Sequence, residues 1–145
     1  QKLCERLNFK SNIIKENEKL EERYEIFILN SFGILSMYFK HAKAVFIGKS
    51  LDKKFKNEGG QNPIEAARFG CKIYHGNYVY NFEEIYNILN QKNIARVIES
   101  SDELSNNLEK DLQKGEKDYK EFVSFMNKLS NQTLRNTMEK LNQFI

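Results

Sequence analysis

Short apolar runs alternate with segments of helical periodicity along the first hundred residues, and this alternation limits the possible folds more than any other feature. It is typical of an α/β domain in which helices connect and cover the strands of a parallel sheet. The runs IFIL at 26–29 and AVFI at 44–47 are almost continuously apolar, as expected of strands covered on both faces. Strands are predicted at 12–15, 25–29, 44–47, 72–75 and 95–98.

Helices are predicted between these strands at 33–42, 63–69 and 82–91. Asn81 followed by Glu84 is a capping-box pattern at the start of the third helix. We therefore predict a Rossmann-like parallel sheet with flanking helices.

The pattern becomes helical after residue 99. Ser101 is the predicted N-cap of one helix, Gly115 interrupts the periodicity, and one or two amphipathic helices follow. We expect residues 1–145 to form one domain, with 101–145 as its C-terminal helices. A doubly wound domain normally opens with a strand, whereas residues 2–7 resemble the end of a helix, so the chain is expected to be a fragment.

Composition excludes several classes of protein. No run approaches the about 18 apolar residues that a membrane-spanning helix needs, and the first ten residues lack the apolar core of a signal peptide. Two cysteines are too few for a disulfide framework, so a reducing cytosolic setting is the default expectation.

Charge is unevenly distributed although the net charge is only +3. Between positions 40 and 56 the only acidic residue is Asp52, and six lysines oppose it: Lys40, Lys43, Lys49, Lys53, Lys54 and Lys56. This stretch is either a solvated loop or a surface that attracts an anionic ligand or anionic lipid headgroups. Arginine is scarce and the aromatic residues are not interleaved with the charges, so nucleic acid is not the expected partner.

Three loops follow predicted strands at the edge of the sheet where open α/β folds bind ligands. They cover residues 30–33, 48–65 and 75–82. In the second loop Gly59 and Gly60 stand directly before a helix, so the backbone can approach a ligand and offer free N–H groups to an anion. Two common phosphate motifs are excluded, because Gly48-Lys49-Ser50 lacks the earlier glycine of a P-loop and no G-x-G-x-x-G occurs.

Glu65 has two interpretations. If Asn62 is the N-cap and Pro63 the first helical residue, Glu65 stands where a capping-box carboxylate belongs. Alternatively, its carboxylate faces the ligand cleft and accepts hydrogen bonds from paired sugar hydroxyls. Spacing leaves both interpretations open.

No metal site or catalytic triad is recognisable in the sequence. His41 and His75 have no neighbouring cysteine or acidic ligands, and we expect both to be structural or solvent-facing. Cys71 is expected to be a small buried residue.

The loops carry a family resemblance. The segment VFIGKSL…GGQNPIEAARFGCKIYHGNYVYNFEEIY resembles the C-terminal half of 3-deoxy-D-manno-octulosonic acid (Kdo) transferases, glycosyltransferases of the GT-B type that act in Gram-negative lipopolysaccharide synthesis. The specific part is the combination of G-G-x-N-P-x-E-A-A with the downstream N-F-x-E-I, and the upstream N-S-F-G-I-L is similar to a family turn. Similarity is dense from Phe27 to Tyr86.

This resemblance implies a domain that binds the donor CMP-Kdo, and an inverting transfer of Kdo to a lipid A precursor without a metal. The reaction would take place at the cytoplasmic face of the inner membrane, with peripheral contact to anionic lipid. An N-terminal domain, absent from these residues, would supply the acceptor site, the membrane anchor and a carboxylate general base. The present chain alone is therefore expected to be inactive.

Roles for the donor-site residues follow from their types. Gly59, Gly60 and Asn62 would hold the nucleotide phosphate or the sugar, and Glu65 would accept from the ribose hydroxyls. The remaining predicted donor-site residues are Ser31 and Gly33, which would line the cytidine side, and Asn81, which would shape the far wall.

Departures from the family pattern leave other functions open. Gln61 replaces the usual His, Ile34 a Glu and Lys49 a Gly, and residues 77–79 replace Pro-His-Thr. The loop between 51 and 59 is also longer than in the family, by about four residues. One alternative is another GT-B transferase, or an epimerase, that uses a UDP-sugar. The other is a non-catalytic flavodoxin-like module that recruits a partner through the lysine loop and the C-terminal helices.

Overall fold

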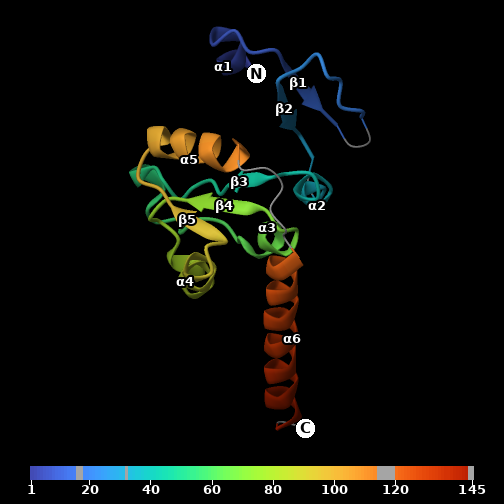
Figure 1. The fold of residues 1–145 in the computed structure, drawn as a ribbon, viewed down its shortest axis with the longest axis vertical. Helices are drawn as coiled ribbons and strands as arrows, with labels where there is room; N and C mark the ends of the chain where they lie inside the picture. The colour runs from blue at the N-terminus through green and yellow to red at the C-terminus, as the bar shows by residue number, and fades with distance from the viewer. Residues whose placement is uncertain (16–17, 32, 114–119, 144–145) are drawn as a thin grey trace. The chain divides into compact units, whose positions relative to one another are not determined.

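The computed structural model describes residues 1–15, 18–31, 33–113 and 120–143. The chain divides into two compact units, residues 1–37 and 38–145. Both units have parallel strands, and a long helix forms the C-terminal part of the second (Figure 1).

The first unit is built on two paired strands. Helix α1 (Lys2–Arg6) precedes β1 (Ser11–Ile14), which pairs in parallel with β2 (Ile26–Leu29). In this register Ser11 is opposite Ile26. Helix α2 (Leu35–Phe39) then crosses the boundary between the two units.

The second unit contains a three-stranded parallel sheet of order β3-β4-β5. Its strands are β3 (Ala44–Phe46), β4 (Lys72–His75) and β5 (Ala95–Val97). Helix α3 (Ile64–Arg68) connects β3 to β4, and α4 (Glu83–Gln91) connects β4 to β5. Two short 3-10 helices, η1 (Lys53–Phe55) and η2 (Tyr80–Phe82), lie in the loops before α3 and α4.

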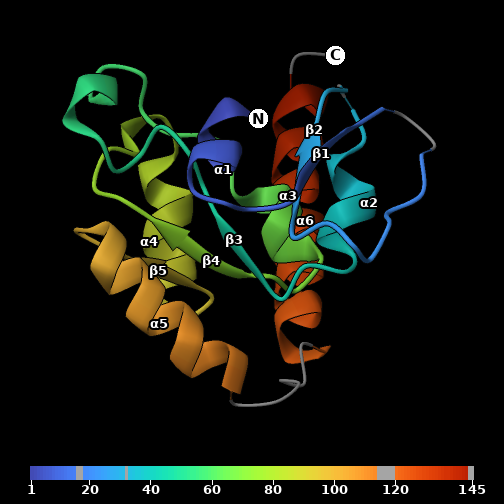
Figure 2. The same cartoon turned by 90° about the horizontal axis from the view of Figure 1, so that it is seen from above.

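Helices cover both faces of this sheet. Figures 1 and 2 show α3 and α4 on one face and α5 (Ser101–Gln113) on the other. The hydroxyl of Tyr74 on β4 donates a hydrogen bond to Asp111 on α5 at 2.5 Å. On the opposite face the core contains the following buried apolar residues: Ala66, Ala67, Ile73, Tyr86, Leu89, Ile94 and Met126.

The C-terminal helix α6 (Lys120–Asn142) packs against α3 through its N-terminal half. Met126 is buried in the core, whereas Leu134, Met138 and Leu141 are exposed where α6 extends away from the sheet (Figure 1). One helix therefore occupies the region for which one or two were predicted. The predicted interruption at Gly115 lies outside the described residues.

The prediction of an α/β fold with parallel strands is confirmed, and all five predicted strands occur within one residue of their expected bounds. The single predicted sheet is instead two separate sheets in the described residues. The expectation that the runs IFIL and AVFI form strands covered on both faces is also wrong. Strand β2 is half-buried throughout and β3 is partly exposed, whereas all four residues of β4 are buried because β4 is the central strand of its sheet.

Two predicted helix caps are wrong. Asn81 does not cap α4, because it lies inside η2 and the helix begins two residues later without a side-chain cap. The cap of α5 is Ser100 rather than Ser101, since the Ser100 hydroxyl accepts from the N–H of Glu103 at 3.1 Å.

No helix among the described residues is both long enough and apolar enough to cross a bilayer.

Candidate functional site

Two loops meet beyond the carboxyl ends of β3 and β4, where parallel sheets bind ligands. They are residues 47–63, which lead into α3, and residues 76–82, which lead into α4. The N–H of Tyr78 in the second loop donates to the carbonyl of Ser50 in the first at 2.8 Å. The buried Ser50 hydroxyl accepts from the N–H of Gly76 at 2.9 Å. These bonds hold the two loops side by side.

Gly59 and Gly60 form a turn at the end of the first loop. Both have left-handed backbone conformations, with φ of +67° and +73°, which glycine adopts without steric cost. A Cβ on Gly59 would lie 2.6 Å from the side-chain nitrogen of Asn81, and one on Gly60 would lie 3.0 Å from the carbonyl oxygen of Tyr78. The turn therefore requires glycine for its conformation and for its close contact with the second loop.

Four consecutive N–H groups in and after this turn donate no hydrogen bond to any described residue: those of Gly59, Gly60, Gln61 and Asn62. Backbone N–H groups without a partner bind anions when successive residues orient them together. Helix α3 has only five residues, so the turn rather than the helix dipole is the main feature available to an anion here.

Helix α3 begins at Ile64 with Pro63 at its N-cap, one residue later than predicted, yet Asn62 still bonds to the first turn. Its side-chain oxygen accepts from the N–H of Ile64 at 2.9 Å, and its side-chain nitrogen has no partner among the described residues. The nitrogen is therefore available to a ligand.

The capping-box interpretation of Glu65 lacks its hydrogen bond. The Glu65 side chain is exposed in the first turn of α3, and its carboxylate contacts no donor or cation in the described part of the chain. The alternative interpretation, a carboxylate available to sugar hydroxyls, is consistent with this geometry and stays a prediction.

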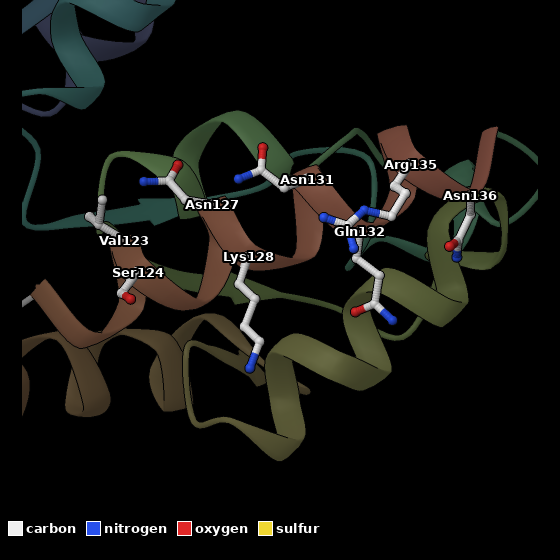
Figure 3. Close-up of a pocket in the computed structure, with 8 residues that line it drawn as sticks. All are labelled: Val123, Ser124, Asn127, Lys128, Asn131, Gln132, Arg135 and Asn136. Carbon is white, nitrogen blue, oxygen red and sulfur yellow. The ribbon is translucent and has the colours of Figure 1, made fainter. Parts of the chain in front are cut away.

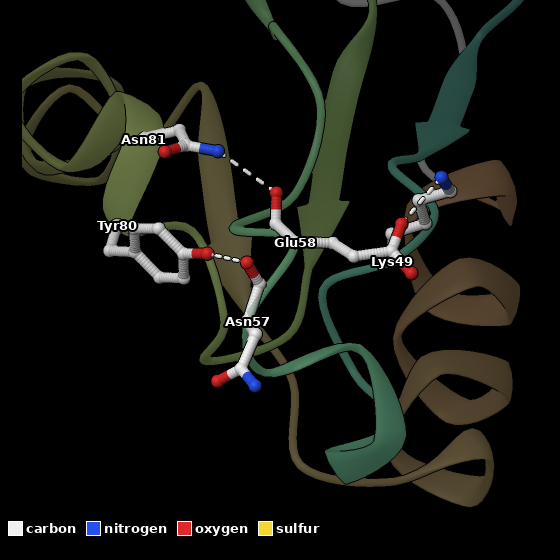
Figure 4. A network of polar contacts seen from close by, with 5 residues as sticks. All are labelled: Lys49, Asn57, Glu58, Tyr80 and Asn81. Atoms are coloured by element: carbon white, nitrogen blue, oxygen red, sulfur yellow. Dashed lines mark hydrogen bonds and ion pairs between the residues drawn. The ribbon is translucent and has the colours of Figure 1, made fainter.

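Asn81 lies directly beside the glycine turn (Figure 4). Its side-chain nitrogen donates to the carbonyl of Glu58 at 2.9 Å, and the adjacent Tyr80 hydroxyl donates to the carbonyl of Asn57. On the other side Lys49 forms an ion pair with the Glu58 carboxylate at 2.5 Å. The structure thus brings Asn81 together with Gly59, and its expected place in the wall of the site stays a prediction.

Tyr86 connects α4 to the same loop. Its buried hydroxyl donates to the carbonyl of Gln61 at 2.8 Å, and burial raises the pKa of this hydroxyl above its ordinary value. The ring of His75 packs on that of Tyr86 with centroids 4.2 Å apart. His75 is buried and lies 2.8 Å from the Gly76 carbonyl oxygen through Nδ1, which agrees with the structural role expected for it.

Two of the predicted donor-site residues belong to the first unit. Ser31 is half-buried, and Gly33 is exposed with a φ of +78° and open space where a Cβ would be. Their expected place beside a cytidine stays a prediction.

Several hollows in the described part of the second unit lie outside the glycine turn. A cavity of about 270 Å³ between the ends of β4 and β5 and helix α4 is lined by His75, Tyr80 and Tyr86 among others. A larger one of about 1180 Å³ runs along one stripe of α6 (Figure 3). Every residue that lines the larger hollow belongs to α6, so it is a groove beside one helix and shares no residue with the loops described above.

The remaining predictions concern metals and Cys71. No group of three or more His, Cys, Asp or Glu side chains in the described ranges could hold a metal ion. Cys71 is buried as predicted, and burial raises the pKa of its thiol.

Three contributors to this site were missed from the sequence: Tyr80, Tyr86 and the Lys49–Glu58 pair. Tyr80 and its partner Asn57 stand 23 positions apart, and local spacing carries no signal for contacts between two loops at that separation. Tyr86 was visible only as part of the motif N-F-E-E-I-Y.

The chain is similar to Kdo transferases in both sequence and fold. No protein-family profile matches it. It is 28% identical over 95 residues to the 3-deoxy-D-manno-octulosonic acid transferase of Haemophilus influenzae, an alignment covering 59% of this chain and 21% of that protein. Its structure matches the C-terminal CMP-Kdo binding domain of WaaA from Acinetobacter baumannii with a TM-score of 0.72 and 18% identity, over 88% of this chain and 64% of that one.

These similarities confirm the resemblance that the loop motifs predict. The structural match also confirms the fold class, an α/β domain with parallel sheets and a long C-terminal helix. The chain spans about a fifth of the length of the curated relative.

Proposed function

We propose that this chain is the donor-binding domain of a Kdo transferase and that its donor is CMP-Kdo. The observation that carries the proposal is the left-handed turn at Gly59 and Gly60, whose N–H groups have no partner among the described residues. It lies in a chain similar to a Kdo transferase and to a CMP-Kdo binding domain.

The turn supplies the groups that a nucleotide phosphate requires. The N–H groups of Gly59, Gly60 and Gln61 donate to the phosphate oxygens, and the free side-chain nitrogen of Asn62 donates to the phosphate or the sugar. The Glu65 carboxylate accepts from the ribose hydroxyls.

Transfer of Kdo breaks the bond between the sugar and the CMP phosphate, so negative charge develops on that phosphate as the bond breaks. Preorganised N–H donors at the turn stabilise this charge. The acceptor, a lipid A precursor, attacks from the opposite side of the sugar and inverts its configuration. The general base and the acceptor groove are expected outside residues 1–145, so these residues alone should show no transferase activity.

The same proposal places the protein at the cytoplasmic face of the inner membrane. Lys53 and Lys56 are exposed and have no carboxylate partner in the described part of the chain, whereas Lys49 and Lys54 are paired with Glu58 and Asp52. The two unpaired amines are available to anionic lipid headgroups.

A titration with CMP tests the proposed donor. Amide resonances of residues 59–65 should shift on addition of CMP. UMP should cause smaller shifts because its base is uracil, and cytidine should cause smaller shifts because it has no phosphate. Equal responses to CMP and UMP would favour an enzyme that uses a UDP-sugar. A spectrum unchanged by either nucleotide would contradict the proposal and favour a non-catalytic interaction module.

A further inference from the structure

The segment Asn57–Glu58, which leads directly into the glycine turn, is held from two sides (Figure 4). From η2, Asn81 donates to the carbonyl of Glu58 at 2.9 Å and Tyr80 donates to the carbonyl of Asn57. From the start of the same loop, three residues after β3, the Lys49 amine pairs with the Glu58 carboxylate at 2.5 Å. Both bonds from η2 end on backbone carbonyls, so they fix the path of the chain and not only a side chain.

We propose that Tyr80 and Asn81 are positioning residues, which hold the turn at Gly59 and Gly60 in the conformation that receives the nucleotide phosphate. This inference rests on the proposed function. It gives Asn81 a role other than direct contact with the nucleotide, because its side-chain nitrogen is already used by Glu58.

Packing supports a role at the turn. A Cβ on Gly59 would lie 2.6 Å from the Asn81 side-chain nitrogen and 2.8 Å from the Tyr80 ring carbon that carries the hydroxyl. The two side chains therefore cover one side of Gly59 at contact distance. Tyr80 is 51% exposed and Asn81 is also exposed. Burial in the core therefore does not explain the position of either side chain.

The turn needs such support because of its composition. Glycine loses more conformational freedom on folding than any other residue, and two of them stand here in succession. The preceding residues 52–58 form a mostly exposed loop whose ion pairs lie at the surface, where each contributes little stability. Without the bonds from η2, we expect this loop and the turn to sample many conformations.

Helix η2 can give that support because it is anchored in the core. Val79 is buried, Phe82 packs against the core cluster, and the Phe82 N–H donates to the Val79 carbonyl at 2.8 Å. Tyr80 and Asn81 thus project from a fixed base. A binding site held in its bound conformation gains affinity because less ordering is required when the ligand arrives.

The test compares Asn81→Leu and Tyr80→Phe with wild type. Asn81→Leu keeps the size of the side chain and removes its donor, and Tyr80→Phe removes only the hydroxyl. Asn77→Leu is the matched control, since Asn77 lies in the same loop, is exposed and has no side-chain hydrogen bond to any described residue. Three quantities are measured: the NMR order parameters of the Gly59 and Gly60 amides without ligand, the affinity for CMP, and the melting temperature.

We expect the order parameters of the Gly59 and Gly60 amides to fall from about 0.85, the value of a rigid backbone, toward about 0.6 in both variants. The affinity for CMP should fall about three- to tenfold, the equivalent of one lost hydrogen bond. The melting temperature should change little, which separates positioning from general stability. Asn77→Leu should match wild type in all three.

Other results would overturn the inference. Reduced CMP affinity with unchanged order parameters in Asn81→Leu would mean that Asn81 contacts the nucleotide itself. Unchanged values in both variants would mean that η2 does not hold the turn. A wild-type protein that binds no CMP would contradict the proposed function instead, and the order parameters would then still show whether Tyr80 and Asn81 hold the turn.

Discussion

The hydroxyl of Ser50 accepts a hydrogen bond from the N–H of Gly76 at 2.9 Å and so joins the ends of β3 and β4. The same hydroxyl donates to the carbonyl of Ile47 at 2.6 Å, and Ser50 is fully buried. Both loops of the candidate site begin at this junction. Its geometry therefore determines how the glycine turn lies against η2.

Gly76→Ala should destabilise the protein strongly. A Cβ at this position would lie 2.2 Å from the carbonyl oxygen of Ser50 and 2.3 Å from the Cα of Leu51, both backbone atoms that cannot rotate away. We expect a loss of about 3 kcal/mol or more in the free energy of unfolding, measured with urea. Gly48→Ala is the control: a Cβ there meets no atom within 4 Å, so its effect should stay within about 0.5 kcal/mol. Equal stability of the two variants would show that the loops separate easily.

Tyr86→Phe should cost about 1–2 kcal/mol of unfolding free energy. The substitution removes the donor to the Gln61 carbonyl at 2.8 Å and leaves that partly buried oxygen without its bond. Tyr78→Phe is the matched control, because the half-buried Tyr78 hydroxyl has no partner among the described residues. If both variants unfold at the urea concentration of wild type, the bond to Gln61 contributes nothing to stability.

Stability should fall at alkaline pH, in part through Tyr74. Burial, with the Asp111 carboxylate beside it, raises the pKa of the Tyr74 hydroxyl above the value of about 10 found in unfolded chains. Above that pH the unfolded chain releases a proton that the folded chain retains, so the free energy of unfolding decreases as pH rises. Urea unfolding between pH 8 and 11 (roughly the range around the unfolded pKa) should show a shallower decline in Tyr74→Phe than in wild type. Parallel curves would contradict this assignment.

If the lysine-rich loop at residues 49–56 contacts the membrane, binding to anionic vesicles should depend on salt and on its lysines. Replacing both Lys53 and Lys56 with Gln should weaken binding to vesicles that contain anionic lipid by roughly ten- to thirtyfold at low salt. The control replaces Lys128 and Lys140, two exposed lysines of α6, with Gln. A loop that is merely solvated would give the same vesicle binding in both double variants.

Much of the fold could be predicted because it depends on local patterns. Apolar runs and helical periodicity located the five strands and the major helices close to their observed bounds. The pairing into two sheets could not be predicted, since it depends on contacts between distant segments. The burial of β4 could not be predicted because Lys72 and His75 are polar. Both have partners in the structure: the Lys72 amine donates to the carbonyl of Asn93 at 2.5 Å, and His75 Nδ1 lies 2.8 Å from the carbonyl oxygen of Gly76.

The candidate site, like the fold, could be predicted only where it depends on local sequence. The close approach of the backbone at Gly59 and Gly60 could be predicted, because glycine permits the left-handed conformation that both residues adopt. The cap at Asn81 was wrong because one turn of 3-10 helix precedes α4 and directs the side chain to Glu58, 23 positions away. Spacing within one segment contains no information about that partner.

Glu65→Gln should weaken binding of CMP by about ten- to a hundredfold, because hydrogen bonds to a charged acceptor are worth roughly 1.5–3 kcal/mol. The amide also replaces part of the acceptor surface with a donor, which two ribose hydroxyls do not match. The melting temperature without ligand should barely change, since the Glu65 carboxylate contacts no donor or cation in the described ranges.

Glu84→Gln provides the comparison that isolates the position from the charge. Glu84 is an exposed carboxylate in the first turn of α4, as Glu65 is in α3, and it also has no described partner. Both variants remove one negative charge near a helix start, so a general electrostatic effect on an anionic nucleotide would raise CMP affinity slightly in both. A loss of affinity confined to Glu65→Gln would therefore require direct contact with the nucleotide. Equal affinity of Glu65→Gln and wild type would remove Glu65 from the site, and the ribose hydroxyls would then need another acceptor.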